Sequence, residues 1–177
     1  MKKISMIVLT VLTFGMTSCD MDKMPYDAIP AEEALTTIVG FEEARAGIYS
    51  VYLGLTGGSY VLAPEVQADA FNAVADFSNK YGELHRWTFE STNSTVETIW
   101  ANCYAAIGRA NFFIDGVGKI DENPEIELTE IQKQQINVYE GEAYFTRAYC
   151  YFYLATLFCR DYDVATAANT PGLPLQV

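Results

Sequence analysis

The 177-residue sequence predicts an all-α fold, in which long amphipathic helices pack as pairs beside one irregular region. Three observations support this prediction. Apolar residues recur at alternating steps of three and four in three separate stretches, which is the period of one helix face. Two of these stretches end at glycines, which commonly terminate helices. Residues without a sustained helical period gather mainly between positions 59 and 93.

The N-terminal residues precede the predicted fold. Lys2 and Lys3 are followed by the apolar run Ile4–Met16, which is typical of a secretory signal peptide and shorter than a membrane-spanning helix of about 20 residues. The run leads into Thr17-Ser18-Cys19, which resembles a bacterial lipobox, where the cysteine is acylated and becomes the new N-terminus. We therefore expect a signal peptide at residues 1–18 and a lipid on Cys19. An ordinary signal peptide with an incidental cysteine is the alternative.

A linker and an acidic domain follow. Residues 19–31 show little apolar periodicity and contain Pro25 and Pro30, which favours a linker. Removal of the two lysines in the signal peptide changes the formal charge from −12 to −14. This charge argues against nucleic acid or an anionic lipid surface as a partner, because both require basic residues. Half of the residues are hydrophobic, enough for one core, and we expect a helical domain at residues 32–177.

The first predicted helix ends at Gly57-Gly58. Between this helix and residue 93 the pattern is irregular, with a helical piece expected at Pro64–Phe77. Residues 85–89 are consistent with a short strand or an extended loop. The apolar seam of the first helix is formed by Phe41, Ala44, Ile48, Val51 and Leu55.

A long helix is expected to begin at Ser94. Ser94 and Glu97 have the spacing of a capping box, in which each side chain accepts a hydrogen bond from an unpaired backbone N–H. This helix cap also explains the glycosylation triplet that begins at Asn93. Gly116 and Gly118 predict the end of the helix. Its apolar seam consists of Val96, Trp100, Cys103, Ile107, Ala110, Ile114 and Val117.

A second long helix is expected from about Glu130 to Phe158, after the acidic loop Asp121–Glu127. Large and small residues alternate along its predicted seam, so that a neighbouring helix can approach closely at the small positions. Residues 148–159 are apolar nearly all round, which predicts burial by several neighbours. The predicted seam consists of Val138, Gly141, Phe145, Ala148, Phe152, Ala155 and Cys159.

The two long helices predict an antiparallel pair, the unit of tetratricopeptide-like repeats. One such pair cannot cover its own apolar surface. The final residues, Asn169–Leu175, read as an extended Pro/Gly stretch that closes nothing. We therefore expect the domain at 32–177 to be incomplete at its C-terminus.

Three cysteines follow Cys19, and an odd number cannot all pair within the chain. Cys150 and Cys159 are separated by about 13 Å of helix, which is beyond the reach of a disulfide. A bridge from Cys103 remains open. Buried free thiols that pack as small hydrophobic residues are the favoured interpretation, since no CxxC or Cys/His spacing suggests zinc.

Taken in order, these features resemble the SusD/RagB family of surface nutrient-binding lipoproteins. The lipobox at Cys19 comes first, followed by Phe41–Tyr49 (FEEARAGIY), which is similar to the first helix of the family. Trp100–Asn111 (WANCYAAIGRAN) resembles the family's W-x-x-x-Y-x-x-I-x-x-x-N helix. Gly141–Leu154 (GEAYFTRAYCYFYL) resembles its most specific motif, G-E-A-x-F-x-R-A-x-x-Y-F-x-L. Gly172–Leu175 (GLPL) fits its G-x-P-L segment.

The resemblance covers the N-terminal portion of the family. It departs at Phe158-Cys159-Arg160-Asp161, where the family usually has a glycine soon after the aromatic residue. The resemblance implies a lipid-anchored protein on the outer membrane that faces the cell exterior. It implies binding of oligosaccharide or peptide and its delivery, without chemistry, to a TonB-dependent SusC-like outer-membrane transporter. A helical-repeat scaffold that binds only protein partners is the alternative, favoured if region 59–93 is buried and exposes no aromatic residue.

Sugar sites stack pyranose faces on exposed aromatic rings and read hydroxyls with polar side chains, and such sites favour loops. The irregular region offers five candidate ligand-binding residues of these types: Asp69, Asn72, Tyr81, His85 and Trp87. For Tyr81 and Trp87, packing under the loop is the competing interpretation, and for His85 it is a solvated or satisfied histidine. For Glu142 and Arg147 we expect pairing with neighbouring helices rather than ligand binding, and for Trp100 a core position.

Signatures of enzymes and cofactors are missing from the sequence. It contains no G-x-S-x-G, no H-E-x-x-H, no Gly-rich phosphate loop and no Ca²⁺-binding loop. A glycosidase needs two carboxylates facing each other across a cleft, whereas Glu140 and Glu142 point to different helix faces. We therefore expect neither an enzyme nor a bound metal or cofactor.

Overall fold

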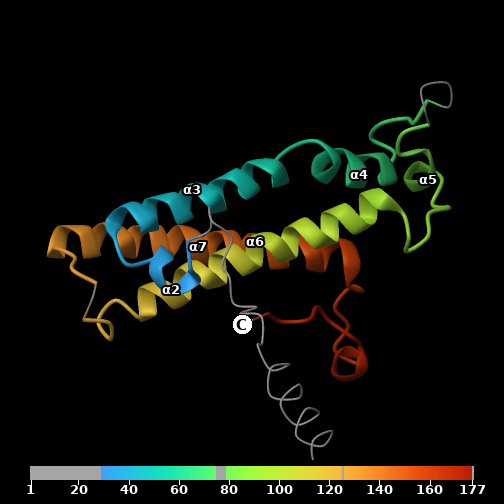
Figure 1. Ribbon diagram of the computed structural model, residues 1–177. Helices are drawn as coiled ribbons and strands as arrows, with labels where there is room; N and C mark the ends of the chain where they lie inside the picture. The colour runs from blue at the N-terminus through green and yellow to red at the C-terminus, as the bar shows by residue number, and fades with distance from the viewer. Residues whose placement is uncertain (1–28, 75–78, 125, 177) are drawn as a thin grey trace, which may run out of the picture. The chain divides into compact units, whose positions relative to one another are not determined.

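The computed structural model describes residues 29–74, 79–124 and 126–176, and these residues form helices and loops without any strand (Figure 1). The all-α prediction is confirmed. The described residues from Ala31 onward belong to one compact unit. The expected signal peptide, the acylated Cys19 and most of the linker lie outside the described residues. None of the described helices combines the length and apolar character needed to cross a membrane.

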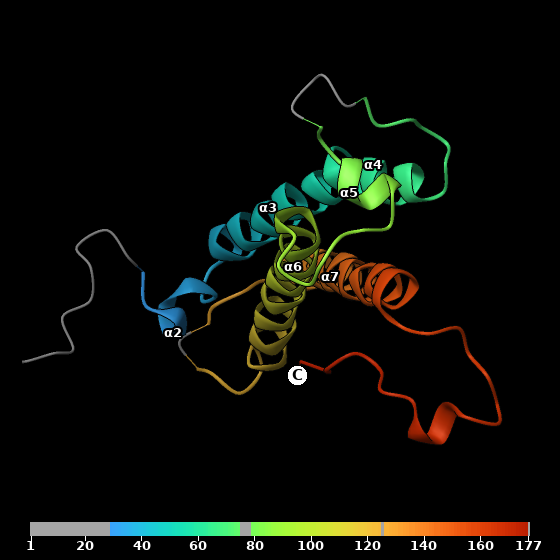
Figure 2. The same cartoon turned by 90° about the vertical axis from the view of Figure 1, so that its right-hand side faces the viewer.

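Three long helices, α3, α6 and α7, pack against one another within this compact unit. Figure 2 views them from the end where α4 and α5 lie. Helix α3 runs from Ile38 to Leu55, after the single turn α2 (Ala31–Ala34). Its N-cap is Thr37, whose hydroxyl accepts a hydrogen bond from the Gly40 N–H at 3.2 Å. The predicted seam of this helix is confirmed, with Phe41, Ile48 and Leu55 buried.

Helix α6 extends from Ser94 to Gly118, but Asn93 is its N-cap, so the predicted Ser94 capping box is wrong. The Asn93 side-chain oxygen accepts hydrogen bonds from the backbone N–H groups of Thr95 and Val96, at 3.1 and 3.4 Å. Asparagine is among the most favourable N-cap residues, so the N-cap lies at Asn93, one position before the Ser94 that the Ser-x-x-Glu spacing suggests. The helix cap therefore accounts for the triplet at Asn93, as expected.

The seam of α6 is rotated relative to the prediction. Cys103, Ile107 and Ala110 are buried as expected, whereas Val96, Trp100, Ile114 and Val117 are only partly buried. The remaining buried positions are Ile99, Ala106, Phe113 and Gly116.

Helix α6 ends at Gly118, one of the two glycines that the sequence predicts for this end, whereas Gly116 lies inside the helix. A Cβ atom at Gly116 would collide with the side chain of Leu35, which packs directly against this position. The glycine therefore permits a close approach between α6 and the residues that follow α2.

Helix α7 runs from Glu130 to Phe158, the bounds that the sequence predicts. A capping box at its start pairs Thr129 and Gln132: the Gln132 N–H donates to the Thr129 hydroxyl, and the Thr129 N–H donates to the Gln132 side chain. Helices α6 and α7 are antiparallel neighbours (Figure 1). Assembly of these helices into tetratricopeptide-like repeats stays a prediction.

The predicted seam of α7 is wrong. Val138 and Phe145 are each 58% exposed, Phe152 is 71% exposed, and Gly141, Ala148 and Ala155 are exposed as well. The expected burial of residues 148–159 by several neighbours is therefore also wrong for the described structure. Another set of residues faces α3 and α6 instead: Ile136, Tyr139, Ala143, Thr146, Cys150 and Leu154.

The core consists of two clusters. One joins Leu35, which follows α2, with α3, α6 and α7 and includes an edge-to-face contact between Phe41 and Phe113, whose ring centroids are 5.5 Å apart. The other anchors α4 and α5 on α6 and α7, through Tyr60 and Leu84 among others. The second cluster therefore fixes the segment that contains the predicted ligand-binding residues.

The C-terminal segment returns to the helices, which corrects the expectation that it closes nothing. After the short 3₁₀ helix η1 (Ala167–Asn169), the chain runs back to α6 and α7. The Tyr104 hydroxyl donates to the Pro174 carbonyl at 2.8 Å, and the Asn111 amide donates to the Gln176 carbonyl at 2.8 Å. The Gln176 N–H donates to the Tyr151 hydroxyl at 2.7 Å.

Candidate ligand-binding site

Helix α4 spans Ser59–Gln67, so the helical piece expected at Pro64–Phe77 begins earlier and ends sooner. Pro64 lies inside this helix and has no N–H to offer the Tyr60 carbonyl one turn earlier. The hydroxyl of Tyr153 on α7 donates a hydrogen bond to that carbonyl instead. A tertiary contact thus satisfies the backbone group that the proline leaves unpaired, which sequence periodicity could not reveal.

Helix α5 is a single turn, Gly82–His85, and residues 86–89 form a turn followed by irregular chain, so the strand considered for residues 85–89 does not form. Leu84, which is 2% exposed, anchors the turn in the core. Tyr81 precedes it, and the Tyr81 hydroxyl lies 2.9 Å from the Ser59 hydroxyl at the start of α4.

Three of the five predicted ligand-binding residues lie together at the C-terminal end of α4. His85 Nε2 is 3.6 Å from Asp69 Oδ1, and the Trp87 indole N–H donates to the Gln67 carbonyl at 3.2 Å. The Trp87 side chain is 66% exposed, so its ring does not pack under the loop. The structure therefore brings Asp69, His85 and Trp87 into one surface region.

The side chains of the other two predicted residues are not part of this group. The Tyr81 backbone carbonyl accepts a hydrogen bond from the His85 N–H at 2.9 Å, but its partly buried side chain reaches Ser59 at the opposite end of α4. Asn72 is exposed on the loop after α4, and no described contact joins it to the other four residues.

Left-handed backbone conformations are concentrated in this region. Among the described residues, the four non-glycine positions with positive φ are Asp69 (59°), Asn79 (49°), Tyr81 (63°) and Trp87 (55°). A left-handed conformation costs a side-chain-bearing residue of order 1 kcal/mol, and such strain tends to occur at functional sites. The strained backbone therefore adds an independent reason to consider the described residues around Asp69 and from Asn79 to Trp87 as a site.

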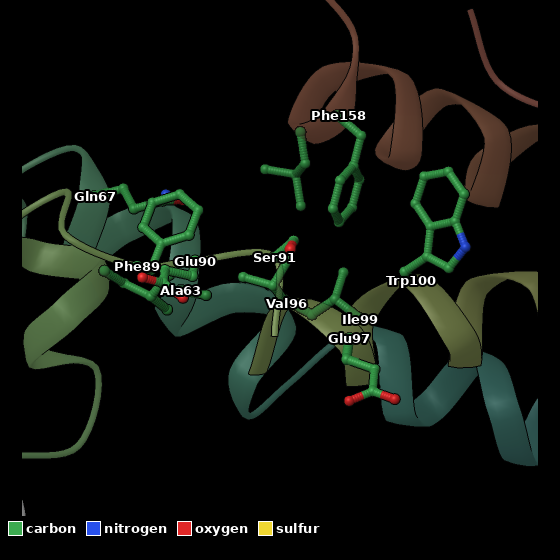
Figure 3. Close-up of a pocket in the computed structure, with 12 residues that line it drawn as sticks. Ala63, Gln67, Phe89, Glu90, Ser91, Val96, Glu97, Ile99, Trp100 and Phe158 are labelled. Atoms are coloured by element: carbon green, nitrogen blue, oxygen red, sulfur yellow. The ribbon is translucent and has the colours of Figure 1, made fainter. Parts of the chain in front are cut away.

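Figure 3 shows a groove of about 530 Å³ whose lining includes Gln67, the residue whose carbonyl accepts the hydrogen bond from Trp87. In Figure 3 the Phe89 ring lies at one end, and the rings of Trp100 and Phe158 lie at the other, where their centroids are 5.0 Å apart. The centroid of the Trp87 ring is 6.1 Å from that of Phe89. The groove is lined by Ala63, Gln67, Leu84, Phe89, Glu90, Ser91, Val96, Glu97, Ile99, Trp100, Leu157 and Phe158.

The groove is mainly apolar, and a polar hollow of about 410 Å³ adjoins it at Glu90, which lines both. The hollow offers hydroxyl, amide and carboxylate groups from Glu83, Thr88, Glu90, Thr92, Asn93 and Ser94. Aromatic walls next to such groups suit a ligand with apolar faces and hydroxyl edges, as in a pyranose ring. Within the described part of the chain, no cluster of His, Cys, Asp or Glu could hold a metal ion.

Sequence reasoning missed Phe89, Glu90 and Phe158 as groove residues and treated Trp100 as core, whereas its side chain is partly buried in the groove wall. Phe89 could have been found from the sequence, because it is an aromatic residue two positions after Trp87 in the same irregular segment. Phe158 could not have been found in this way, because it comes from the far end of α7.

The charged residues of the sequence motifs hold helices together, as expected for Glu142 and Arg147. Arg45 of α3 donates two hydrogen bonds to the Glu142 carboxylate of α7, at 2.5 and 2.9 Å. This bidentate contact lowers the pKa of Glu142 below its ordinary value and raises that of Arg45. Arg147 donates to the Asn111 side-chain oxygen at 2.9 Å, and Asn111 in turn donates to the carbonyl of Gln176. The motifs therefore join three helices and the C-terminal segment.

Comparisons with known proteins agree with this arrangement. A family model for SusD-like proteins, described as "Starch-binding associating with outer membrane", matches residues 26–175. The "SusD-like protein P2" of Formosa agariphila is 26% identical over 163 residues, which cover 88% of this chain. The chain spans only 29% of the length of that relative. No solved structure matches the chain.

Proposed function

Because the chain belongs to the SusD-like family, we propose that it is a binding protein that captures an oligosaccharide at the outer membrane and delivers it to a TonB-dependent transporter. The family description combines starch binding with association with the outer membrane. The observation that most supports a binding role for this part of the protein is the exposed Trp87 beside the aromatic groove.

The chemistry of the region suits a carbohydrate. The exposed face of Trp87 provides a stacking platform, and the nearby ring of Phe89 extends it toward the groove. Asp69 and His85 lie close enough to each other to hydrogen-bond the hydroxyls of one sugar residue. The groove volume of about 530 Å³ falls within the range of small-molecule sites.

Calorimetric titration of the chain with a panel of oligosaccharides tests this function. We expect one class of glycan to bind, and Trp87→Ala to weaken that binding about tenfold, which corresponds to about 1.4 kcal/mol. Tyr162→Ala is the matched control, because Tyr162 is also an exposed aromatic residue (82%, against 66% for Trp87) and lies far along the chain, on the loop after α7. Absence of binding to every glycan, or an equal effect of both variants, would contradict the proposal.

Anchoring and delivery form a separate part of the proposal. Residues 1–18 would be removed, Cys19 would carry the lipid, and residues 19–31 would link it to the domain that begins at residue 32. Labelling cells with a palmitate analogue should mark the wild-type chain and leave Cys19→Ala unlabelled. Affinity purification of the anchored protein from outer membranes should recover the TonB-dependent transporter, whether the delivered nutrient is a glycan or a peptide.

The scaffold alternative depended on a buried region 59–93 without exposed aromatic residues. Phe71 and Trp87 are both more than half exposed, so this condition is not met in the described part of the region. The binding function therefore remains the favoured proposal.

A further inference from the structure

Cys103 of α6 and Cys150 of α7 are adjacent across the interface between the two helices. Both side chains are completely buried in the same core cluster, and the residues that directly follow them, Tyr104 and Tyr151, pack edge to face with ring centroids 6.4 Å apart. Both residues are thiols in the structure. We propose that Cys103 and Cys150 form a disulfide in the exported protein and so tie α6 to α7.

The packing of α6 and α7 permits this bond. A disulfide needs Cα atoms about 4.4 to 6.8 Å apart, which requires closely packed helices. Ala106 of α6 is buried in the same cluster as the two cysteines, and Ala110 and Ala143 are buried in the neighbouring cluster between the same two helices. These small side chains allow the backbones of α6 and α7 to approach each other on the side of the cysteines nearer the second cluster.

The structure also selects this pair among the three cysteines. Cys159 is only partly buried, at the C-terminal end of α7, nine positions beyond Cys150. Nine positions correspond to about 13 Å of helix, so Cys159 and Cys150 cannot bond. Cys103 faces Cys150, which leaves Cys159 as the free thiol.

The bond forms by thiol–disulfide exchange with an oxidising partner, a thiol–disulfide oxidase of the exported compartment. One chain thiolate attacks the disulfide of the oxidase, which forms a mixed disulfide and releases one oxidase thiolate. The second chain thiolate then attacks the chain sulfur of the mixed disulfide and expels the other oxidase thiolate. The chain loses two protons and two electrons, and the oxidase becomes a dithiol. Because both cysteines are buried after folding, this exchange takes place while the chain folds.

The proposal rests on association with the outer membrane and not on ligand binding. A negative glycan titration would therefore leave the disulfide proposal unaffected, and a negative result in the test below would leave glycan binding unaffected. The test uses the full chain produced with its own signal peptide and isolated with outer membranes. Acid quenching and N-ethylmaleimide in denaturant block the free thiols, and trypsin then releases residues 87–109 and 148–160. Tandem mass spectrometry then determines whether these two peptides are linked and which cysteines carry maleimide.

We expect the two peptides to be linked, with a mass two hydrogens below their sum and a single maleimide on Cys159. Reduction before blocking should separate them and add maleimide to all three cysteines. Three maleimides without reduction, or a link through Cys159, would overturn the proposal.

Two variants sharpen the test, and neither depends on a folded state because blocking is done in denaturant. Cys159→Ser should leave the link intact. Cys103→Ala should make Cys150 react without reduction. In the wild type, reduction should lower the melting temperature by about 10 °C, because the bond closes a loop of more than 40 residues. An unchanged melting temperature after complete reduction of the linked species would overturn the proposal that the bond ties the two helices together.

Discussion

The two faces of α7 have the same periodicity and opposite environments. The inner face packs on α3 and α6 through residues such as Ala143 and Leu154, which are fully buried. The outer face, represented by Val138, Phe145 and Phe152, is apolar and largely exposed in the described structure. Apolar spacing at steps of three and four therefore shows that a helix has a face suited to packing. It does not show which of two such faces is covered by a neighbouring helix.

The polar residues on the two sides of α7 explain part of this difference. Glu142 and Arg147 bind Arg45 of α3 and Asn111 of α6, and these contacts set the rotation of α7 about its axis. Thr146, which lies between them, is buried, and its hydroxyl donates a hydrogen bond to the backbone carbonyl of Glu142 at 3.0 Å. Hydrogen-bond partners on neighbouring helices thus select the inner face where apolar periodicity alone is ambiguous.

The largest effect should come from the inner face. Leu154→Ala removes a fully buried side chain, and we expect the free energy of unfolding to fall by about 3 kcal/mol, because a cavity remains. Phe152→Ala, two residues earlier on the outer face, is the matched control and should change it by less than about 0.5 kcal/mol. Urea denaturation measures both. Equal losses would mean that the outer face is covered as well as the inner one.

A smaller effect is expected where α7 supports α4. Tyr153→Phe leaves the Tyr60 carbonyl without its hydrogen bond at the proline inside α4. We expect a loss of about 1 to 2 kcal/mol in urea denaturation, because an unpaired, partly buried carbonyl keeps its desolvation cost. Tyr151→Phe is the control, since the Tyr151 hydroxyl contacts only the exposed C-terminal segment. A Tyr153→Phe protein as stable as the control would show that another group satisfies this carbonyl.

The ion pair of Glu142 predicts a pH dependence of stability. Its pKa is lowered from the ordinary value of 4.5, chiefly by the hydrogen bond from Arg45. A depressed carboxylate pKa stabilises the folded state above the unfolded value, and this contribution is lost as the pH falls below about 4.5 through the folded pKa.

The contribution should be at most about 1 kcal/mol, because both side chains are partly exposed to solvent. Glu142→Gln should lose it at pH 7 and show a shallower decline in melting temperature between pH 5 and 3, the range that spans the ordinary carboxyl pKa. Glu140→Gln serves as the control and should decline like the wild type. Parallel pH profiles for wild type and Glu142→Gln would contradict the assignment.

The smallest effect on stability is expected on the outer face, where surface properties should change instead. The double variant Val138→Ser/Phe152→Ser should unfold within about 0.5 kcal/mol of the wild type. Its binding of an anilinonaphthalene sulfonate dye and its tendency to aggregate should both decrease, because an exposed apolar patch is removed. Dye fluorescence and light scattering measure these properties. A strong destabilisation would show that the outer face contributes to the packed core.

The sequence by itself determined the all-α class, the bounds of α7, the start of α6 to within one residue and the seam of α3. These features depend on interactions between residues close together in the chain, such as helix caps and the period of one face. The sequence also indicated the region of the candidate site, because exposed aromatic and polar residues were concentrated in one irregular segment.

Only the tertiary structure decided which face of α7 is covered, because both faces satisfy the helical period and the choice rests on Arg45 and Asn111 of other helices. It also placed Pro64 inside a helix, since the hydroxyl that compensates for its missing N–H comes from a residue far along the chain. The aromatic groove was decided in the same way, because Phe89 and Phe158 meet across it from separate elements. Contacts between distant residues set these features, and local periodicity contains no information about such contacts.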